Sequence, residues 1–148
     1  MIDTEKSIII TRSVEEVFNY VSILTHSAEW QSGLTEIRQI NKQPLGVGTQ
    51  FAFVRTFMGR KMEANNEITE FIPYTLVAFK TISGPIPAEP SYHFEPAETG
   101  TKLTAKIIMQ PRGFISLAEL LIATSLQRDV EANLKGLKDM LESQAVSV

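Results

Sequence analysis

Hydrophobic residues recur along the chain with two periods, and the change of period separates predicted strands from predicted helices. A β-branched run at Lys6–Thr11 predicts a first strand. Apolar residues then recur at helical spacing from Val14, which predicts an amphipathic helix capped by Ser13. A shorter helical turn is expected at Ser27–Gln31, ended by Gly33.

From Leu34 onward the pattern has the period of strands. In the most regular part, a two-residue loop at Gly59–Arg60 would make a hairpin that pairs Phe57 with Met62. This register places apolar side chains on one face and polar side chains on the other, and a shift by one residue would destroy that separation. The segment therefore predicts a sheet with one apolar face.

The remaining turns extend the same sheet. A turn around Pro73 pairs Ile68 with Phe79, and a loop at Ala97–Gly100 forms a last hairpin. The proline-rich stretch 83–91 is not expected to form a central strand, because proline has no N–H for the ladder. About seven antiparallel strands are predicted in total.

A long helix is expected to cover the apolar face. It is predicted over Phe114–Glu142, with a helical stripe at Leu126, Val130, Leu134, Leu137 and Leu141. The apolar stretch 116–123 carries more hydrophobic surface than one sheet contact requires. The pattern as a whole favours a single α+β domain over residues 1–148, with a sheet layer and a helix layer.

Composition narrows the classes of function. The net charge is −3 and the basic residues are scattered, which argues against a nucleic-acid partner. The chain has no cysteine and two histidines, so we expect no metal and no cofactor. No apolar run approaches the roughly 20 residues that span a bilayer, and the N-terminus does not resemble a signal peptide. We therefore expect a cytoplasmic protein without stable membrane insertion.

Several segments, in this order, carry a family likeness: "SVEEVFNYVS", "AEWQSG", "LGVGTQF", "EITEFIPYTLVAFKT", "YHFEP" with "GTKLT", and "NLKGLKDMLE". With them the chain resembles the START-like (SRPBCC) superfamily, in particular its bacterial polyketide cyclase/dehydrase-type members. The resemblance implies a helix-grip fold, in which a curved sheet wraps around a long C-terminal helix and two short helices follow the first strand. It also implies a small hydrophobic ligand (a lipid, a polyketide-like or an aromatic molecule) between sheet and helix, but no particular reaction.

The concave face supplies the candidate site. Aromatic and aliphatic side chains there would line an adaptable pocket of several hundred Å³, the usual range for ligands, although plain core packing explains many of them equally well. The candidate ligand-binding residues are Trp30, Phe51, Phe53, Arg55, Phe57, Asn66, Ile68, Phe79, Thr81, Tyr92, Phe94, Ile107 and Leu121.

Arg55 is the most informative of the polar candidates. It could bind a carboxylate, phosphate or enolate oxygen, or it could extend to water and pair with a carboxylate such as Glu119. Trp30 is expected to face inward as an apolar plug, while His26 is expected to be at least partly exposed. His93 should project from the polar face of its strand.

Three functions remain open from sequence. The first is binding of a small hydrophobic ligand. The second is a cyclase or dehydratase, with Arg55 stabilising an enolate and Tyr92 or His26 moving a proton. The third is a partner-binding module that forms a homodimer through the apolar stretch 116–123.

Overall fold

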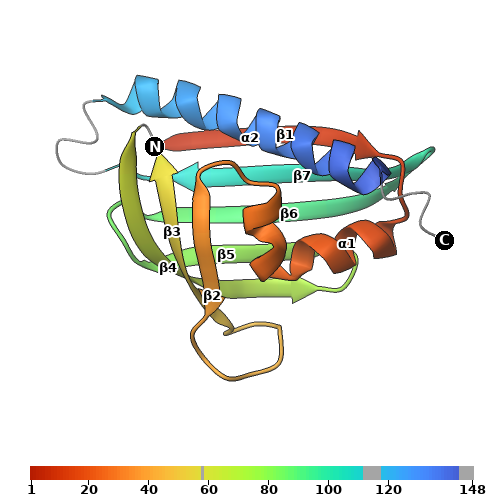
Figure 1. Cartoon of the computed structure of the whole chain (residues 1–148), viewed down its shortest axis with the longest axis horizontal. Coiled ribbons are helices and arrows are strands. Elements are labelled where there is room, and N and C mark those ends of the chain that lie inside the picture. The colour runs from red at the N-terminus through yellow and green to blue at the C-terminus, as the bar shows by residue number, and fades with distance from the viewer. Residues whose placement is uncertain (58, 112–117, 144–148) are drawn as a thin grey trace.

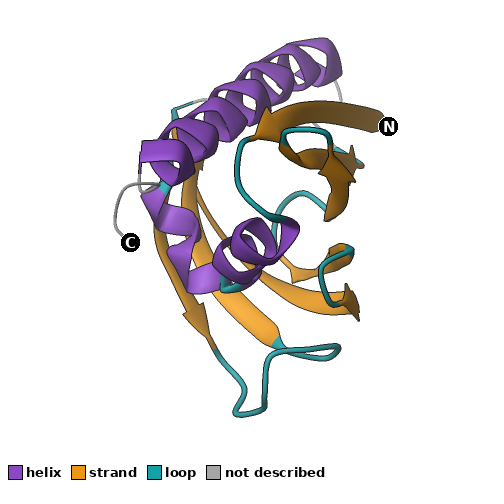
Figure 2. Cartoon of the chain, turned by 90° about the vertical axis from the view of Figure 1, so that its right-hand side faces the viewer, coloured by secondary structure: helices purple, strands orange, loops and turns teal. Residues whose placement is uncertain are grey.

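The computed structural model describes residues 1–57, 59–111 and 118–143. One curled antiparallel sheet of seven strands has the order β1-β7-β6-β5-β4-β3-β2, and the helices lie on its concave side (Figures 1 and 2). This is the helix-grip fold that the sequence predicted. The elements are β1 (Ile2–Ile10), α1 (Val14–Ser22), the 3₁₀ helix η1 (Leu24–Glu29), β2 (Leu34–Gln39), β3 (Gln50–Phe57), β4 (Arg60–Ile72), β5 (Leu76–Ser83), β6 (Ala88–Ala97), β7 (Gly100–Met109) and α2 (Glu119–Ser143).

The first strand is longer than predicted. It begins at Ile2 rather than Lys6, because Ile2 and Thr4 are buried and continue the pairing of β1 with β7. Asp3 and Glu5, which alternate with them, face outward and hid the pattern from a search for β-branched runs. The consequence is a full-length β1 along which α2 lies (Figure 1).

The helix after β1 begins as predicted. The Ser13 hydroxyl accepts a hydrogen bond from the Glu16 amide at 3.2 Å, so Ser13 is the N-cap. The second short helix was placed too late. It is a 3₁₀ turn beginning at Leu24, with Ser27 buried inside it rather than at its start, because Leu24 itself enters the core.

Gly33 lies in the turn directly before β2 and does not end the short helix as predicted, because η1 already ends at Glu29. The φ of Gly33 is +87°, and a Cβ would lie 2.7 Å from the Thr56 carbonyl oxygen. A side chain is therefore excluded by both the backbone conformation and the space.

The register of the β3–β4 hairpin differs from the prediction by two residues. Phe57 pairs with Arg60 and Arg55 with Met62, so the strand resumes directly after Gly59. Gly59 adopts a φ of +77°, a conformation that glycine accepts more readily than Arg60. A shift by two residues keeps each side chain on its predicted face, which is why the assignment of the two faces survived.

The β4–β5 and β6–β7 registers are as predicted, with Ile68 opposite Phe79 and Phe94 opposite Leu103. The prediction that the stretch 83–91 stays outside the central strands was wrong for its last residues. The strand β6 begins at Ala88 and includes Pro90. Proline is tolerated there because the pairing of β5 with β6 covers only Leu76–Ala78 with Ser91–His93.

The long helix α2 spans Glu119–Ser143, and its whole predicted stripe is buried: Leu126, Val130, Leu134, Leu137 and Leu141. The predicted start at Phe114 lies outside the described residues. At the beginning of α2, Leu120 and Leu121 are 80% and 65% exposed, so these two leucines of the apolar stretch do not enter the core. Gly136 passes near the Trp30 carbonyl oxygen, where an added Cβ would make an ordinary contact at 3.9 Å.

No helix in the described ranges is long and apolar enough to cross a bilayer. The core lies between the concave face of the sheet, α1 and α2. Phe18 from α1 packs edge-on against Phe71, Tyr74 and Phe94, which closes one end of the curled sheet.

Candidate functional site

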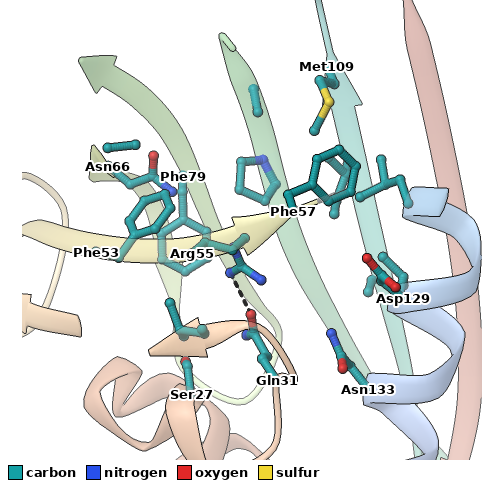
Figure 3. Close-up of a pocket in the computed structure, with 18 of the residues that line it drawn as sticks. Ser27, Gln31, Phe53, Arg55, Phe57, Asn66, Phe79, Met109, Asp129 and Asn133 are labelled. Atoms are coloured by element: carbon teal, nitrogen blue, oxygen red, sulfur yellow. Dashed lines mark hydrogen bonds between the residues drawn. The ribbon is translucent and has the colours of Figure 1, made fainter. Parts of the chain in front are cut away.

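A cavity of about 200 Å³ lies between the concave face of the sheet, the segment around Trp30 and α2. It is smaller than the several hundred Å³ expected, because bulky side chains such as Phe51, Phe57 and Phe79 occupy much of the space. Figure 3 shows residues of β3, β4, β5, β7, η1 and α2 converging on this cavity. The curl of the sheet thus brings together segments that are far apart in sequence.

Most of the residues proposed from sequence line the cavity. They are Trp30, Phe51, Phe53, Arg55, Phe57, Asn66, Phe79, Thr81, Tyr92 and Ile107. Except for Trp30, which follows η1, they share the concave face because alternate residues of each strand point to the same side. Whether they bind a ligand stays a prediction.

Three proposed residues lie elsewhere. Ile68 and Phe94 are buried in the core beyond the cavity, where alternation on the concave face does not distinguish wall from packing. Leu121 is 65% exposed because the neighbouring Ile122, at 3%, is the residue of α2 that turns inward. Hydrophobicity alone predicts neither the position of Ile68 and Phe94 beyond the cavity nor the exposure of Leu121.

The Arg55 side chain lies at the cavity and does not pair with Glu119, the alternative that the sequence left open. Its Nη2 donates to Gln31 Oε1 at 2.7 Å (Figure 3), and Gln31 Nε2 donates to the Tyr92 hydroxyl oxygen at 3.1 Å. Glu119 instead accepts from the N-terminal amino group. A relay of three polar side chains therefore forms one wall of a largely apolar cavity.

Burial controls the electrostatics of this wall. It lowers the pKa of the Arg55 guanidinium, and the proximity of Tyr92 and Asp129 partly opposes the shift. Burial also raises the pKa of the Tyr92 phenol, with Arg55 and Gln31 acting in the opposite direction. Tyr92 is consequently protonated at neutral pH, and its hydroxyl hydrogen is free of the bond that its oxygen accepts from Gln31.

The sequence pattern did not indicate three polar residues of the cavity, namely Gln31, Asp129 and Asn133. Asp129 and Asn133 reach it from α2 across from Arg55 (Figure 3). Their spacing of four residues beside the stripe at Leu126–Leu134 is a signal that could have found them. Gln31 lies in an irregular segment, where no periodicity indicates which way a side chain points.

Trp30 is the plug that the sequence predicted. Its side chain is 7% exposed and lines the cavity, with its ring edge-on to Tyr92 at 5.9 Å between centroids. The position follows from η1, which ends at Glu29 and directs the next side chain inward. The indole nitrogen has no hydrogen-bonding partner among the described residues.

His26 and Glu29 do not form a site with each other. His26 is partly exposed, as expected, and stacks on the ring of Tyr20, whose hydroxyl donates to Glu29. Both residues thus fix η1 to α1 outside the cavity. His93 lies opposite Thr104 as predicted, is half-buried, and bonds with the Ser91 hydroxyl at 2.9 Å.

Thr81 lines the cavity, but its hydroxyl is already engaged. It accepts from the Ala88 amide at 3.1 Å and donates to the Ala88 carbonyl oxygen at 3.3 Å. These two bonds join β5 to β6 beyond the end of their backbone ladder. Thr81 is thus held in a structural role.

Solved structures share this architecture. The protein TTHA0849 from Thermus thermophilus superposes with a TM-score of 0.81 at 20% identity, over 93% of this chain and 94% of that one. The Zhui aromatase/cyclase from Streptomyces sp. R1128 superposes with a TM-score of 0.79 at 10% identity, over 97% and 94%. The di-domain aromatase/cyclase StfQ of the steffimycin pathway gives 0.80 at 15% identity, over 97% of this chain and 52% of that one.

At these identities the likeness concerns the fold alone. No curated protein matched the chain in a sequence comparison. The model of the family described as "Polyketide cyclase / dehydrase and lipid transport" matches residues 1–142, nearly the whole chain. The chain therefore belongs to this family, and with it to the START-like (SRPBCC) superfamily that its motifs resemble.

Proposed function

We propose that this protein binds a small hydrophobic ligand in the cavity between the sheet and α2. The observation that carries the proposal is a largely apolar cavity of about 200 Å³ with polar side chains gathered at Arg55. Apolar walls provide the driving force for binding, and a few placed polar groups fix the orientation of the ligand. The family description, which names lipid transport beside cyclisation, supports the same class of ligand.

Trp30 allows a direct test, because it is the single tryptophan of the chain and lines the cavity. Titration with 1-tetralone or decanoic acid should shift its fluorescence, and native mass spectrometry should show a one-to-one complex. Ala105→Leu should weaken binding, because Ala105 is a buried wall residue and the larger side chain reduces the cavity.

The matched control is Ala132→Leu on the exposed surface of α2, which should bind as the unmodified protein does. If no probe alters the fluorescence or the mass of the protein, the binding proposal is contradicted. If the control variant weakens binding as much as Ala105→Leu does, the cavity is not the binding site.

A second candidate function is a cyclase or dehydratase acting in the same cavity. The observation that favours it is the placement of the Arg55 guanidinium, the protonated Tyr92 hydroxyl and the Asp129 carboxylate on the walls of one cavity. Arg55 could stabilise an enolate oxygen, Tyr92 could donate a proton and Asp129 could accept one. His26 lies outside the cavity lining, which removes it from this scheme.

Turnover of a synthetic poly-β-ketone thioester tests the second candidate. Arg55→Met and Tyr92→Phe should each lower kcat by about a hundredfold or more, within the range for loss of an oxyanion donor or a general acid. His26→Gln is the matched control and should leave kcat unchanged. Turnover that is unaffected by Arg55→Met would contradict an enzymatic role for this cavity.

A further inference from the structure

Two opposite charges lie on facing walls of the cavity. The Arg55 guanidinium projects from β3 and the Asp129 carboxylate from α2 (Figure 3). Among the described residues, the lining holds one further charged side chain, Lys106, whose amine pairs with Glu5 at 3.4 Å. Arg55 and Asp129 are therefore the charges that the cavity presents to a ligand.

Neither charge has an oppositely charged partner in direct contact. No ion pair within the described ranges involves Arg55 or Asp129. Arg55 instead donates to the neutral side-chain amide of Gln31. A charge held in largely apolar surroundings without a partner costs free energy, so a ligand that pairs with both groups would recover that cost on binding.

The free atoms of both side chains are accessible to a bound molecule. Arg55 and Asp129 are half-buried rather than buried. Within the described part of the chain, the fully buried side-chain nitrogen and oxygen atoms that lack a partner are Thr4 Oγ1, Trp30 Nε1 and Asn66 Oδ1. The Asp129 oxygens and the Arg55 nitrogens other than Nη2 are not among these atoms, so they keep accessible surface in side chains that line the cavity.

Asn133 adds a donor one turn beyond Asp129 on α2. Its Oδ1 accepts from the Ser32 amide at 3.0 Å and from the Ser32 hydroxyl at 3.2 Å. A backbone N–H can only donate, so these bonds assign the carboxamide oxygen to Ser32 and leave the Asn133 amino group toward the cavity (Figure 3). The cavity thus offers donors at Arg55 and Asn133 and an anionic acceptor at Asp129.

We propose that the ligand is an amphipathic zwitterion, a compact apolar body that carries a carboxylate and an ammonium group close together. This inference rests on the proposed binding function and specifies its ligand class. The carboxylate pairs with Arg55 and Asn133, the ammonium group pairs with Asp129, and the apolar body, of about the size of one ring, fills the rest of the cavity of about 200 Å³. A fatty acid would leave Asp129 unpaired and bring a second carboxylate near it, and a simple amine would do the equivalent at Arg55.

A series of small molecules tests the charge pattern by isothermal titration calorimetry near neutral pH. L-phenylalanine carries both charges, 3-phenylpropanoate lacks the ammonium group, and 2-phenylethylamine lacks the carboxylate. The uncharged probe is 1-tetralone. We expect L-phenylalanine to bind about tenfold or more tightly than either singly charged relative, because it alone forms charge-assisted bonds on both walls.

Variants assign each charge to its residue. Asp129→Asn keeps the shape of the side chain and should abolish the advantage of L-phenylalanine over 3-phenylpropanoate. Arg55→Gln should abolish the advantage over 2-phenylethylamine, and if this variant does not fold, the comparison with Asp129→Asn decides alone. The matched controls are Asp139→Asn on α2 and Arg38→Gln on β2, since both residues are exposed and absent from the cavity lining. Both controls should leave the affinities unchanged.

The outcomes separate this inference from the binding proposal. If 1-tetralone binds and L-phenylalanine does not, or if the three phenyl compounds bind with equal affinity, the zwitterion is wrong while the cavity remains a ligand site. If L-phenylalanine keeps its full advantage in Asp129→Asn, or loses it equally in Asp139→Asn, Asp129 does not hold the ammonium group and the inference is overturned. If nothing in the series binds, 1-tetralone included, the binding proposal fails and the inference fails with it.

Discussion

At the scale of single residues, the most consequential contact is that of Gln31 with both Arg55 and Tyr92. Arg55 can only donate, so it fixes the Gln31 amide oxygen as the acceptor, and the Gln31 amide nitrogen then donates to Tyr92. Tyr92 is left as a donor toward the cavity, and the buried Arg55 guanidinium has a neutral hydrogen-bond acceptor in Gln31. The polar wall is therefore organised before any ligand arrives.

The buried Tyr92 phenol makes a prediction about alkaline pH. Its pKa is raised by burial, so the folded state keeps a proton that the unfolded chain loses near pH 10. This contribution to stability is complete below about pH 10 and is lost as the pH rises above it. In Tyr92→Phe, the free energy of unfolding should fall less steeply between about pH 10 and 12, as measured by urea titration.

A second tyrosine also contributes at alkaline pH. The pKa of the Tyr20 phenol is raised as well, by burial first and then by Glu29. Both proteins keep Tyr20, so its contribution cancels in the difference between them. Parallel pH profiles for the two proteins would contradict the burial of Tyr92.

At the scale of elements, α2 is held in two different ways along its length. Its apolar stripe packs against the concave side of the sheet, and its C-terminal end is tied to the segment after β1. There Glu142 accepts from the Thr11 amide at 2.9 Å and from Lys138 Nζ at 2.6 Å. At the start of the helix, Leu120 and Leu121 do not pack against a comparable apolar surface formed by the described residues.

Paired substitutions along α2 test this difference. Leu137→Ala should reduce the free energy of unfolding by about 2–5 kcal/mol, because a fully buried leucine leaves a cavity. Leu121→Ala should change it by less than about 0.5 kcal/mol, since that side chain is largely exposed. Chemical denaturation measures both, and equal effects would contradict the orientation of α2.

The anchor at Glu142 predicts a response to acid. Bonds from Lys138 and then Thr11 lower the pKa of Glu142 from 4.5 to about 2. A depressed pKa contributes stability above the ordinary value, and this contribution is lost as the pH falls from 4.5 toward 2. Glu142→Gln should flatten the acid limb of stability over that interval in thermal melts, whereas the exposed Glu98→Gln should not.

At the scale of the whole molecule, the cavity joins segments from both ends of the chain. Its walls include the residues around Trp30 and one face of α2 between Leu126 and Leu134. A ligand should therefore stabilise these segments together, because it binds only the folded arrangement.

Hydrogen exchange with saturating 1-tetralone measures that coupling. Amides at Trp30–Gln31 and along Leu126–Leu134 should exchange more slowly, while those of β1, which is absent from the cavity lining, should change little. Slower exchange confined to the exposed start of α2 would place the ligand outside the cavity.

A homodimer through Leu120 and Leu121 stays a prediction of the sequence, and their exposure is compatible with it. Sedimentation velocity over a hundredfold range of concentration tests it. A sedimentation coefficient that does not change with concentration contradicts a reversible dimer at this surface.

The amino-acid sequence by itself determined the order of the elements, the two faces of the sheet and the family. Those features depend on local periodicity, on turn residues such as Gly33, and on motifs that lie close together in the chain. The apolar wall residues followed from the same alternation, since a shift of two residues in the β3–β4 hairpin leaves each side chain on its face.

Only the tertiary structure decided the composition of the site. The curl of the sheet and the rotation of α2 separate wall residues such as Phe53 from core residues such as Ile68, although both lie on the concave face. They also bring Gln31, Asp129 and Asn133 to the cavity from segments whose side-chain directions depend on packing. That Trp30 Nε1 and Asn66 Oδ1 have no hydrogen-bonding partner within the described ranges is likewise a property of three-dimensional neighbours, because a partner can come from distant parts of the chain.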